Sequence, residues 1–227
     1  MASEKIIMHP SSEMLLNQAM GNTSEAESLI ILGHAAYCPA CKAELEKYEN
    51  LGGNYLNNND TTDISVGLLE KTLDKIDKTD QVVEDKNFTD HKIRSNLTEE
   101  KIRIPSFFTQ YLDRKVDTIL WNSTINNVRY TNLTFSDKNI TGKFLEIPPG
   151  KSMPKHGHEG EEATLVLHGG YSDERGHYHK GDLVIAKDSE VHSPVASKDT
   201  GCLCLVIYSG SIRFKGLLGS ILNLSKF

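Results

Sequence analysis

Apolar residues recur at helical spacing through the first eighty residues, between signals that start and stop helices. Ser11 and Ser12 precede a short periodic stretch that Gly21 ends, which predicts a first helix. Ser24 and Glu27 have the spacing of a capping box ahead of a second, strongly apolar helix. The amino-terminal part of the chain is therefore predicted to be helical.

The helical pattern continues through two further segments. Pro39 favours the first turn of a third helix, which we expect to end at Gly52 and Gly53, before a polar linker over residues 54–63. Residues 65–78 then predict a fourth, amphipathic helix. Its apolar positions lie three or four residues apart: Val66, Leu69, Leu73 and Ile76.

Past residue 79 the pattern changes twice. Residues 79–103 are charged and poor in apolar side chains, which predicts a mobile connector. Short runs of β-branched and aromatic residues follow, separated by Gly, Pro, Asn and Asp turns, which is typical of an all-β barrel or sandwich. The predicted strands are 128–135, 142–147, 163–168, 177–179, 183–186 and the run around Cys202.

Composition and charge narrow the possible functions. The 227 residues carry a formal net charge of −6, which argues against a general nucleic-acid binder because phosphate contacts need clustered Lys and Arg. No apolar run reaches the roughly 20 residues of a membrane helix, and the first residues lack the pattern of a secretory signal. We therefore expect a cytoplasmic protein that binds neither membranes nor nucleic acids directly.

Four candidate metal ligands lie in the helical part. His34, Cys38 and Cys41 form the pattern His-x-x-x-Cys-x-x-Cys, which puts the first two on one helical face. Cys41 follows a proline-containing turn, and His9 is the free candidate for a fourth ligand. Two imidazoles and two thiolates are typical of a closed, structural zinc site. The alternatives are a thiol pair with incidental histidines, or a fourth ligand other than His9.

A second ligand set lies in the β part. His156 and His158 share one face of a strand, Glu162 follows a tight turn, and His192 belongs to a later strand. Three imidazoles and a carboxylate form a more open site that suits zinc, iron or manganese. The adjacent Glu161 should point the other way on an extended chain. The alternative is a β domain that has lost its metal.

Other cysteines and histidines are assigned structural roles. Cys202 and Cys204 share a strand face within an apolar run, so we interpret them as small buried hydrophobes, with a redox role as the lesser alternative. His168, His177 and His179 lie outside both ligand spacings, and we predict that they are structural or solvated.

These spacings resemble two known domains. The His-x-x-x-Cys-x-x-Cys pattern with an upstream histidine resembles the zinc-binding anti-sigma domain. The pattern Gly-x5-His-x-His-x3-Glu-x6-Gly, from Gly150 to Gly169, fits the first cupin motif in full. The second cupin motif keeps Gly181 and His192 but lacks its usual Pro, Gly and Asn.

Together the halves resemble the ChrR family of anti-sigma factors, which join a zinc anti-sigma domain to a carboxy-terminal cupin. Further segments that share this likeness are 104–112, 161–173 and 201–218. The resemblance implies an α+β protein of two domains. These are a small zinc-bound helical bundle over 1–80 and, after a linker over 81–103, an all-β cupin (double-stranded β-helix) barrel over 104–227.

The resemblance also implies transcriptional control without catalysis. The helical domain would sequester an extracytoplasmic-function (ECF) sigma factor, with the helix over 65–78 burying its apolar stripe on that partner. The cupin, with zinc or alternatively iron or manganese, would release the sigma factor on exposure to singlet oxygen or organic hydroperoxides, and could pair with another copy. One alternative is a cupin dioxygenase that uses iron at the second ligand set; another is a zinc-dependent adaptor for a different partner.

Overall fold

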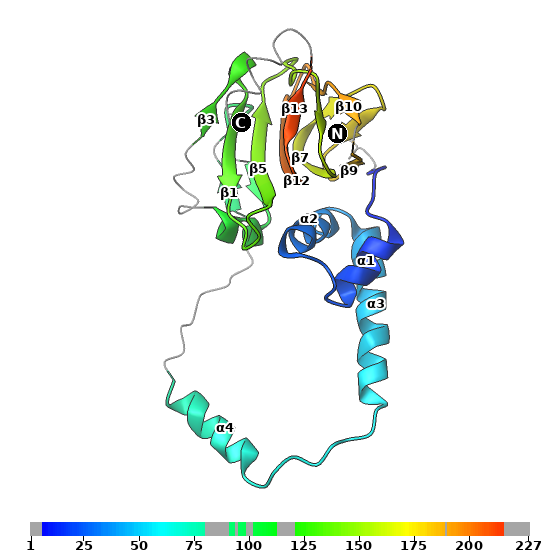
Figure 1. Cartoon of the computed structure of the whole chain (residues 1–227), viewed down its shortest axis with the longest axis vertical. Coiled ribbons are helices and arrows are strands. Elements are labelled where there is room, and N and C mark those ends of the chain that lie inside the picture. Colours follow the sequence, from blue (N-terminus) through cyan, green and yellow to red (C-terminus); the bar gives the residue numbers. More distant parts are fainter. Residues whose placement is uncertain are drawn as a thin grey trace.

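Helices form the amino-terminal part of the protein and strands the rest, as the sequence predicts (Figure 1). The computed structural model describes residues 6–79, 91–93, 95–98, 102–112, 121–188 and 190–215. Among these residues no helix is both long and apolar enough to cross a membrane. The α-helices in this part of the chain are α1 (Ser12–Ala19), α2 (Glu25–Ala35), α3 (Pro39–Asn57) and α4 (Leu68–Asp77).

The first two helices begin where the capping signals predict. The Ser11 side chain accepts a hydrogen bond from the backbone N–H of Met14. Ser24 and Glu27 form a complete capping box, in which each side chain accepts from the other residue's backbone N–H. These bonds satisfy N–H groups that have no partner inside the helix.

The predicted end of the third helix is wrong. Helix α3 continues through Gly52 and Gly53 to Asn57, so the polar linker begins four residues later than expected. Neither glycine is among those with positive φ, which means that both keep helical geometry instead of forming a left-handed cap. A glycine inside a helix costs only about 1 kcal/mol, which the rest of a long helix can offset.

The strands form two main sheets. The larger sheet has the order β11-β7-β12-β5-β4-β3, with β8 and β9 also paired to β7, and the smaller has the order β10-β6-β13. All of these pairings are antiparallel. The strands are β3 (Asn122–Ser123), β4 (Arg129–Leu133), β5 (Ile140–Ile147), β6 (His156–His158), β7 (Glu162–Ser172), β8 (His177–His179), β9 (Leu183–Ala186), β10 (Val191–His192), β11 (Val195–Ala196), β12 (Cys202–Ser209) and β13 (Ile212–Phe214).

The predicted connector is partly structured. Strand β1 (His91–Ile93) pairs with β2 (Ile102–Ile104), which precedes the 3-10 helix η1 (Ser106–Tyr111). Ile102 and Ile104 are buried, because their side chains join the main hydrophobic core. The expectation of mobility over 79–103 is therefore wrong for the paired strands, while residues 80–90 lie outside the described part of the chain.

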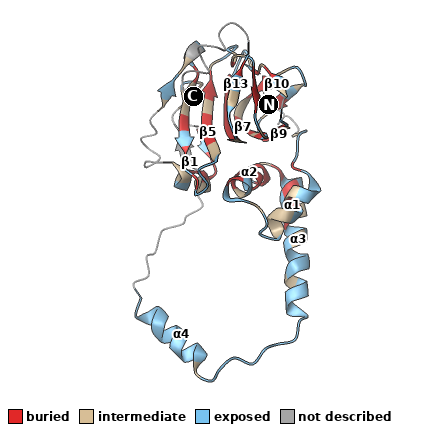
Figure 2. Ribbon diagram, in the orientation of Figure 1, coloured by how far each residue is buried: buried red, intermediate tan, exposed pale blue. Residues whose placement is uncertain are grey.

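The larger sheet is covered on both faces. On β12, Leu203, Leu205 and Ile207 face the helices, whereas Cys204 and Val206 face the interior of the β domain. This alternation is that of any strand, but here both sets are buried. Figure 2 shows α2 as a buried helix lying against the strands. The helical and β parts therefore share one hydrophobic core.

The far end of the helical part is exposed. The second half of α3 and all of α4 extend away from the β domain, and none of α4 is buried (Figures 1 and 2). Leu51 and Tyr55 on α3, and Leu69 and Leu73 on α4, are each at least half exposed. These apolar side chains have no cover among the described residues.

Candidate metal centres

The structure brings each predicted ligand set together. In each set, one ligand atom per residue lies within 4.8 Å of the others. The first set joins the helices to the segment before α1, and the second lies between the two sheets of the β domain. The sets are His9, His34, Cys38 and Cys41, and His156, His158, Glu162 and His192.

The amino-terminal set forms where three helices and an extended segment meet. His34 lies in the last turn of α2, Cys38 is the N-cap of α3, and Cys41 is in its first turn. His9 precedes α1, and its Nδ1 lies 3.5 Å from the Sγ of Cys38 and 3.4 Å from the Sγ of Cys41. Donor atoms this close, from two thiols and imidazoles, match a tetrahedral site with Zn–S bonds of about 2.3 Å and Zn–N bonds of about 2.0 Å.

The ring of His34 is prepared to bind a cation. Its Nδ1 lies 2.7 Å from the carbonyl oxygen of Gly181, which can only accept, so Nδ1 carries the proton. Burial lowers the pKa of His34 to about 4, which keeps the ring neutral near pH 7. The Nε2 lone pair is buried and finds no hydrogen-bond partner among the described residues. A metal ion would supply that partner.

The Cys41 thiol stays neutral unless a cation binds it. Burial, and then the hydrogen bond and charge of Cys38, raise the pKa of the Cys41 thiol to about 12. A bound zinc ion reverses this preference, because it binds the thiolate and displaces the proton. The donor set therefore fits a zinc ion that binds both sulfurs as thiolates.

The second set lies between the sheets. Strand β6 carries His156 and His158, β10 carries His192, and Glu162 begins β7 on the facing sheet. The Nε2 of His192 lies 3.0 Å from that of His156 and 3.4 Å from that of His158. The Nε2 of His158 lies 3.0 Å from Oε2 of Glu162. All four side chains are buried.

The protonation of this set also favours a cation. Nδ1 of His156 lies 2.7 Å from the carbonyl oxygen of Pro154, so it donates and leaves the Nε2 lone pair for a metal. Burial lowers the pKa of His156 to about 4. Burial works to raise the pKa of Glu162, but the hydrogen bond from His158 and the nearby histidines outweigh it and hold that pKa below its usual value. A carboxylate among three imidazoles is a metal-ligand set.

Outer residues orient these ligands. The Oδ2 of Asp173 lies 3.5 Å from Nδ1 of His192, and Arg175 donates to the same oxygen from two nitrogens. Thr164 donates its hydroxyl to Glu162. Metal-binding histidines commonly have a carboxylate or carbonyl at their other nitrogen, as His192 and His156 have here.

A cavity of about 50 Å³ adjoins the second set. His156, Glu162 and His192 line it together with apolar side chains and Cys204. Its apolar part includes Leu145, Ile147, Met153, Val206 and Ile212. The arrangement leaves a small, largely apolar space beside the ligand atoms, which a closed structural site would lack.

The remaining sequence predictions divide as follows. Cys202 and Cys204 are buried and unpaired, and Glu161 is exposed while Glu162 is buried, as expected. Neither His177 nor His179 joins a ligand set in the described chain. The sequence did not reveal the roles of Asp173 and Asp182. Asp173 begins the predicted turn 173–176 and Asp182 follows Gly181, so the sequence indicates turns at both places. Only the folded chain shows which partner each carboxylate meets.

Comparison with known proteins extends this picture. A model of the ChrR cupin-like domain matches residues 111–211. A curated protein of Cereibacter sphaeroides, anti-sigma-E factor ChrR, is 29% identical over 215 residues, which is 95% of each chain. The solved structure of ChrR in complex with SigE, from Rhodobacter sphaeroides, is 27% identical with a TM-score of 0.70 and covers 90% of this chain and 100% of that one. The predicted cupin fold is confirmed.

Proposed function

The chain resembles the ChrR anti-sigma factors from its first helices to its last strands, and on this premise we propose that it is a zinc-dependent anti-sigma factor. The observation that carries the proposal is the likeness over 90% of the chain to a ChrR solved with its sigma factor. The partner is then an ECF-type sigma factor, and we place the protein in the cytoplasm, where that partner acts.

The exposed helices supply the partner surface. Leu69, Leu73 and Ile76 lie on one side of α4 at helical spacing, and all are about half exposed or more. Leu51 and Tyr55 repeat the pattern on the free half of α3. An amphipathic helix that packs on no other described part of its chain is suited to bury its apolar side on another protein. We propose that α3 and α4 grip the sigma factor between them.

Binding of a purified ECF sigma factor from the same organism tests this function. Leu73→Asp should weaken binding about 10- to 100-fold, as the loss of a central apolar anchor does, and leave the stability of the free protein unchanged. Lys71→Gln is the matched control, because it makes the same change in charge on the opposite side of α4. If wild type does not bind, or if both variants bind like wild type, this partner surface is rejected.

A metal ion at the amino-terminal ligand set would stabilise the helices that carry the partner surface. We propose that zinc binds His9, His34, Cys38 and Cys41 and fixes α1, α2 and the start of α3 as one unit. Such a site contributes roughly 10 kcal/mol or more of binding free energy that is also folding free energy. We assign residues 1–80 to this domain, with residues 81–103 as the connection, in which β1 and the start of β2 lie.

The cupin, over residues 104–227, would control release. We propose that zinc, or iron or manganese, binds His156, His158, Glu162 and His192, and that singlet oxygen or an organic hydroperoxide acts there. The support is the small cavity beside the ligand atoms, which leaves space for an exogenous oxidant. A cupin that pairs with a second copy is compatible with this role.

The likeness to an anti-sigma factor over 95% of the chain supports a regulator, and catalysis is not needed to explain the second ligand set. Elemental analysis distinguishes a regulator from a dioxygenase. Two zinc ions per chain without oxygen uptake on diketone or thiol substrates would favour the regulator, and stoichiometric iron with turnover would favour the enzyme.

A further inference from the structure

One turn of the β domain contacts the amino-terminal ligand set. This turn, residues 179–183, joins β8 to β9 and is hereafter the latch turn. The Asp182 carboxylate is fully buried at the boundary between the helical and β parts. Its Oδ1 accepts from the backbone N–H groups of Ile7 at 2.7 Å and Met8 at 2.9 Å, and its Oδ2 accepts from that of His179 at 2.7 Å.

These bonds fix the position of His9. The carbonyl oxygen of Met8 accepts from the backbone N–H of Leu183 at 3.1 Å, so Met8 is bound to the latch turn through both of its backbone groups. His9 follows directly, on an exposed segment that belongs to no helix. His9 itself is exposed, and the latch turn fixes the residue that directly precedes it, which places this ligand beside Cys38 and Cys41.

The same turn orients a second ligand. The carbonyl oxygen of Gly181 accepts from Nδ1 of His34 and so determines which nitrogen of that ring is free. Gly181 has φ +96°, and a Cβ there would lie 2.5 Å from Cδ1 of Ile6. Glycine is therefore required for the amino-terminal segment to approach the turn this closely.

The latch turn also leads to the second ligand set. Strand β9 begins at Leu183, directly after Asp182, and its last residue, Ala186, pairs with Glu162 on β7. Four residues of strand therefore separate the turn that positions His9 and His34 from the backbone of a ligand in the other set. A displacement at one end of β9 would therefore be passed to its other end along a short, hydrogen-bonded strand.

We propose that the latch turn of the cupin is the outer shell of the amino-terminal metal site, with Asp182 and Gly181 as positioning residues, so that this site depends on the cupin domain. The inference deepens the proposed function, since it rests on metal binding at the first ligand set. It identifies the physical contact through which the state of the cupin would reach the domain that grips the sigma factor. Loss of the latch turn would loosen two of the four ligands together.

Cobalt binding by the full-length protein tests the proposal. Only the first ligand set contains thiolates, so a sulfur-to-cobalt charge-transfer band reports that site alone. Asp182→Ala should weaken cobalt binding there about 10- to 100-fold, as loss of an outer-shell partner does. Asp182→Asn should reduce the cobalt affinity less. Its Oδ1 still accepts from the backbone N–H groups of Ile7 and Met8, but its amide NH₂ replaces the oxygen that accepted from the N–H of His179.

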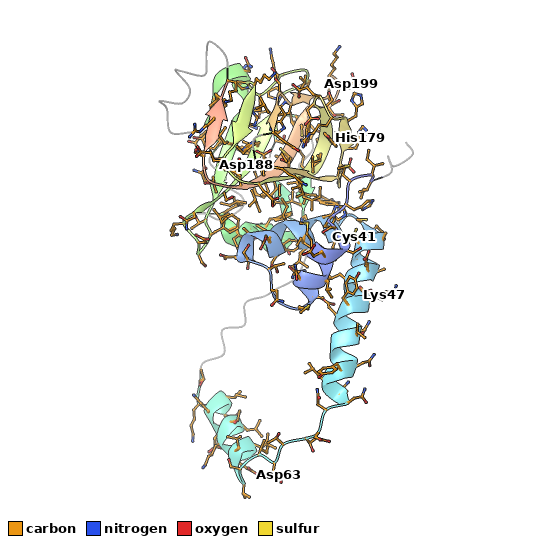
Figure 3. All side chains as sticks on the ribbon, turned by 45° about the vertical axis from the view of Figure 1, so that its right-hand side comes forward. Cys41, Lys47, Asp63, His179, Asp188 and Asp199 are labelled. Atoms are coloured by element: carbon orange, nitrogen blue, oxygen red, sulfur yellow. The ribbon has the colours of Figure 1, made fainter. Side chains whose placement is uncertain are left out.

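Asp199→Ala is the matched control, because it removes the same charge from an exposed residue of the same domain (Figure 3). Cobalt affinity of Asp182→Ala and Asp182→Asn equal to that of Asp199→Ala would overturn the proposal, even if their melting temperatures fell. A wild-type protein without the charge-transfer band would instead reject the metal site on which the proposal rests. Sigma-factor binding, measured separately, shows whether the proposed function survives either result.

Discussion

At the scale of single residues, two carbonyl oxygens determine the chemistry of two histidines. Gly181 and Pro154 each accept from an Nδ1, which directs the Nε2 of His34 and of His156 towards the other ligands. Burial lowers the pKa of both rings to about 4, so that they are neutral and able to bind a metal at neutral pH. Each site is thus prepared for a cation before one binds.

Single substitutions should distinguish the roles of the two ligand sets. Cys38→Ser removes a thiolate from the first set, so zinc content should fall from two ions per chain towards one and inhibition of the sigma factor should be abolished. His158→Ala should empty only the second set, leaving inhibition intact but blocking induction by hydroperoxide. Zinc analysis and a sigma-dependent transcription assay measure both effects, and the reverse pair of phenotypes would contradict this division.

At the scale of elements, α2 lies between two layers. It is apolar around most of its circumference, because one side meets α1 and α3 while the other packs on the larger sheet. At Gly33 a Cβ would lie 2.6 Å from Cζ of Phe108 and 2.8 Å from Cδ2 of Leu165. The absence of a side chain at Gly33 is what allows the helix to approach the strands this closely.

Two glycine substitutions should therefore act in opposite directions. Gly33→Ala should destabilise the protein by about 1–3 kcal/mol, because the packed core must move to accept a methyl group. Gly52→Ala, in the exposed half of α3 with nothing within 4 Å, should stabilise by up to about 1 kcal/mol through helix propensity. Denaturant midpoints measure both changes, and stabilisation by Gly33→Ala would contradict the tight contact of α2 with the sheet.

At the scale of the whole molecule, the helical and β parts share one hydrophobic core, although each has its own set of candidate metal ligands. Figure 3 shows Cys41 where the helices meet the strands, with Asp63 far away on the exposed loop. The bond from the backbone N–H of Ser136 to Glu25, at 2.8 Å, adds to the shared core and the latch turn. The molecule thus combines a packed contact between its two parts with two exposed helical segments, α4 and the second half of α3.

Removal of metal should reduce the local stability of some parts of this molecule more than that of others. Helix α1 has eight residues, too few for a stable helix by itself, so it depends on its packing against α2 and α3 beside the first ligand set. After chelation, hydrogen exchange should become faster in α1 and the first turn of α3, while β12, paired on both sides, stays protected. Unchanged exchange in α1 after verified metal loss would show that zinc does not support the bundle.

The sequence by itself determined the helices, the central strands and both ligand sets. Capping residues, strand alternation and ligand spacing are local properties. The pair at i, i+2, His156 and His158, has nearly fixed geometry once β6 forms. Cys38 lies beyond the end of α2 but still donates its backbone N–H to the carbonyl oxygen of His34, so these two residues also stay close. It could not determine the end of α3, because glycine permits a helix as well as its termination. The position of His9 in space could not be predicted either, because a separation of 25 residues from His34 fixes no distance between the two side chains.

The tertiary structure alone decided how the two halves meet. Asp182 lies 174 residues along the chain from Met8, and Gly181 lies 147 residues from His34. Separations of this size leave no periodic signal in the sequence. Only the docking of the helical part, with its leading segment, on the β domain brings them within hydrogen-bonding distance. Long-range contacts of this kind arise from packing, which depends on all of the surfaces that meet and not on any one segment.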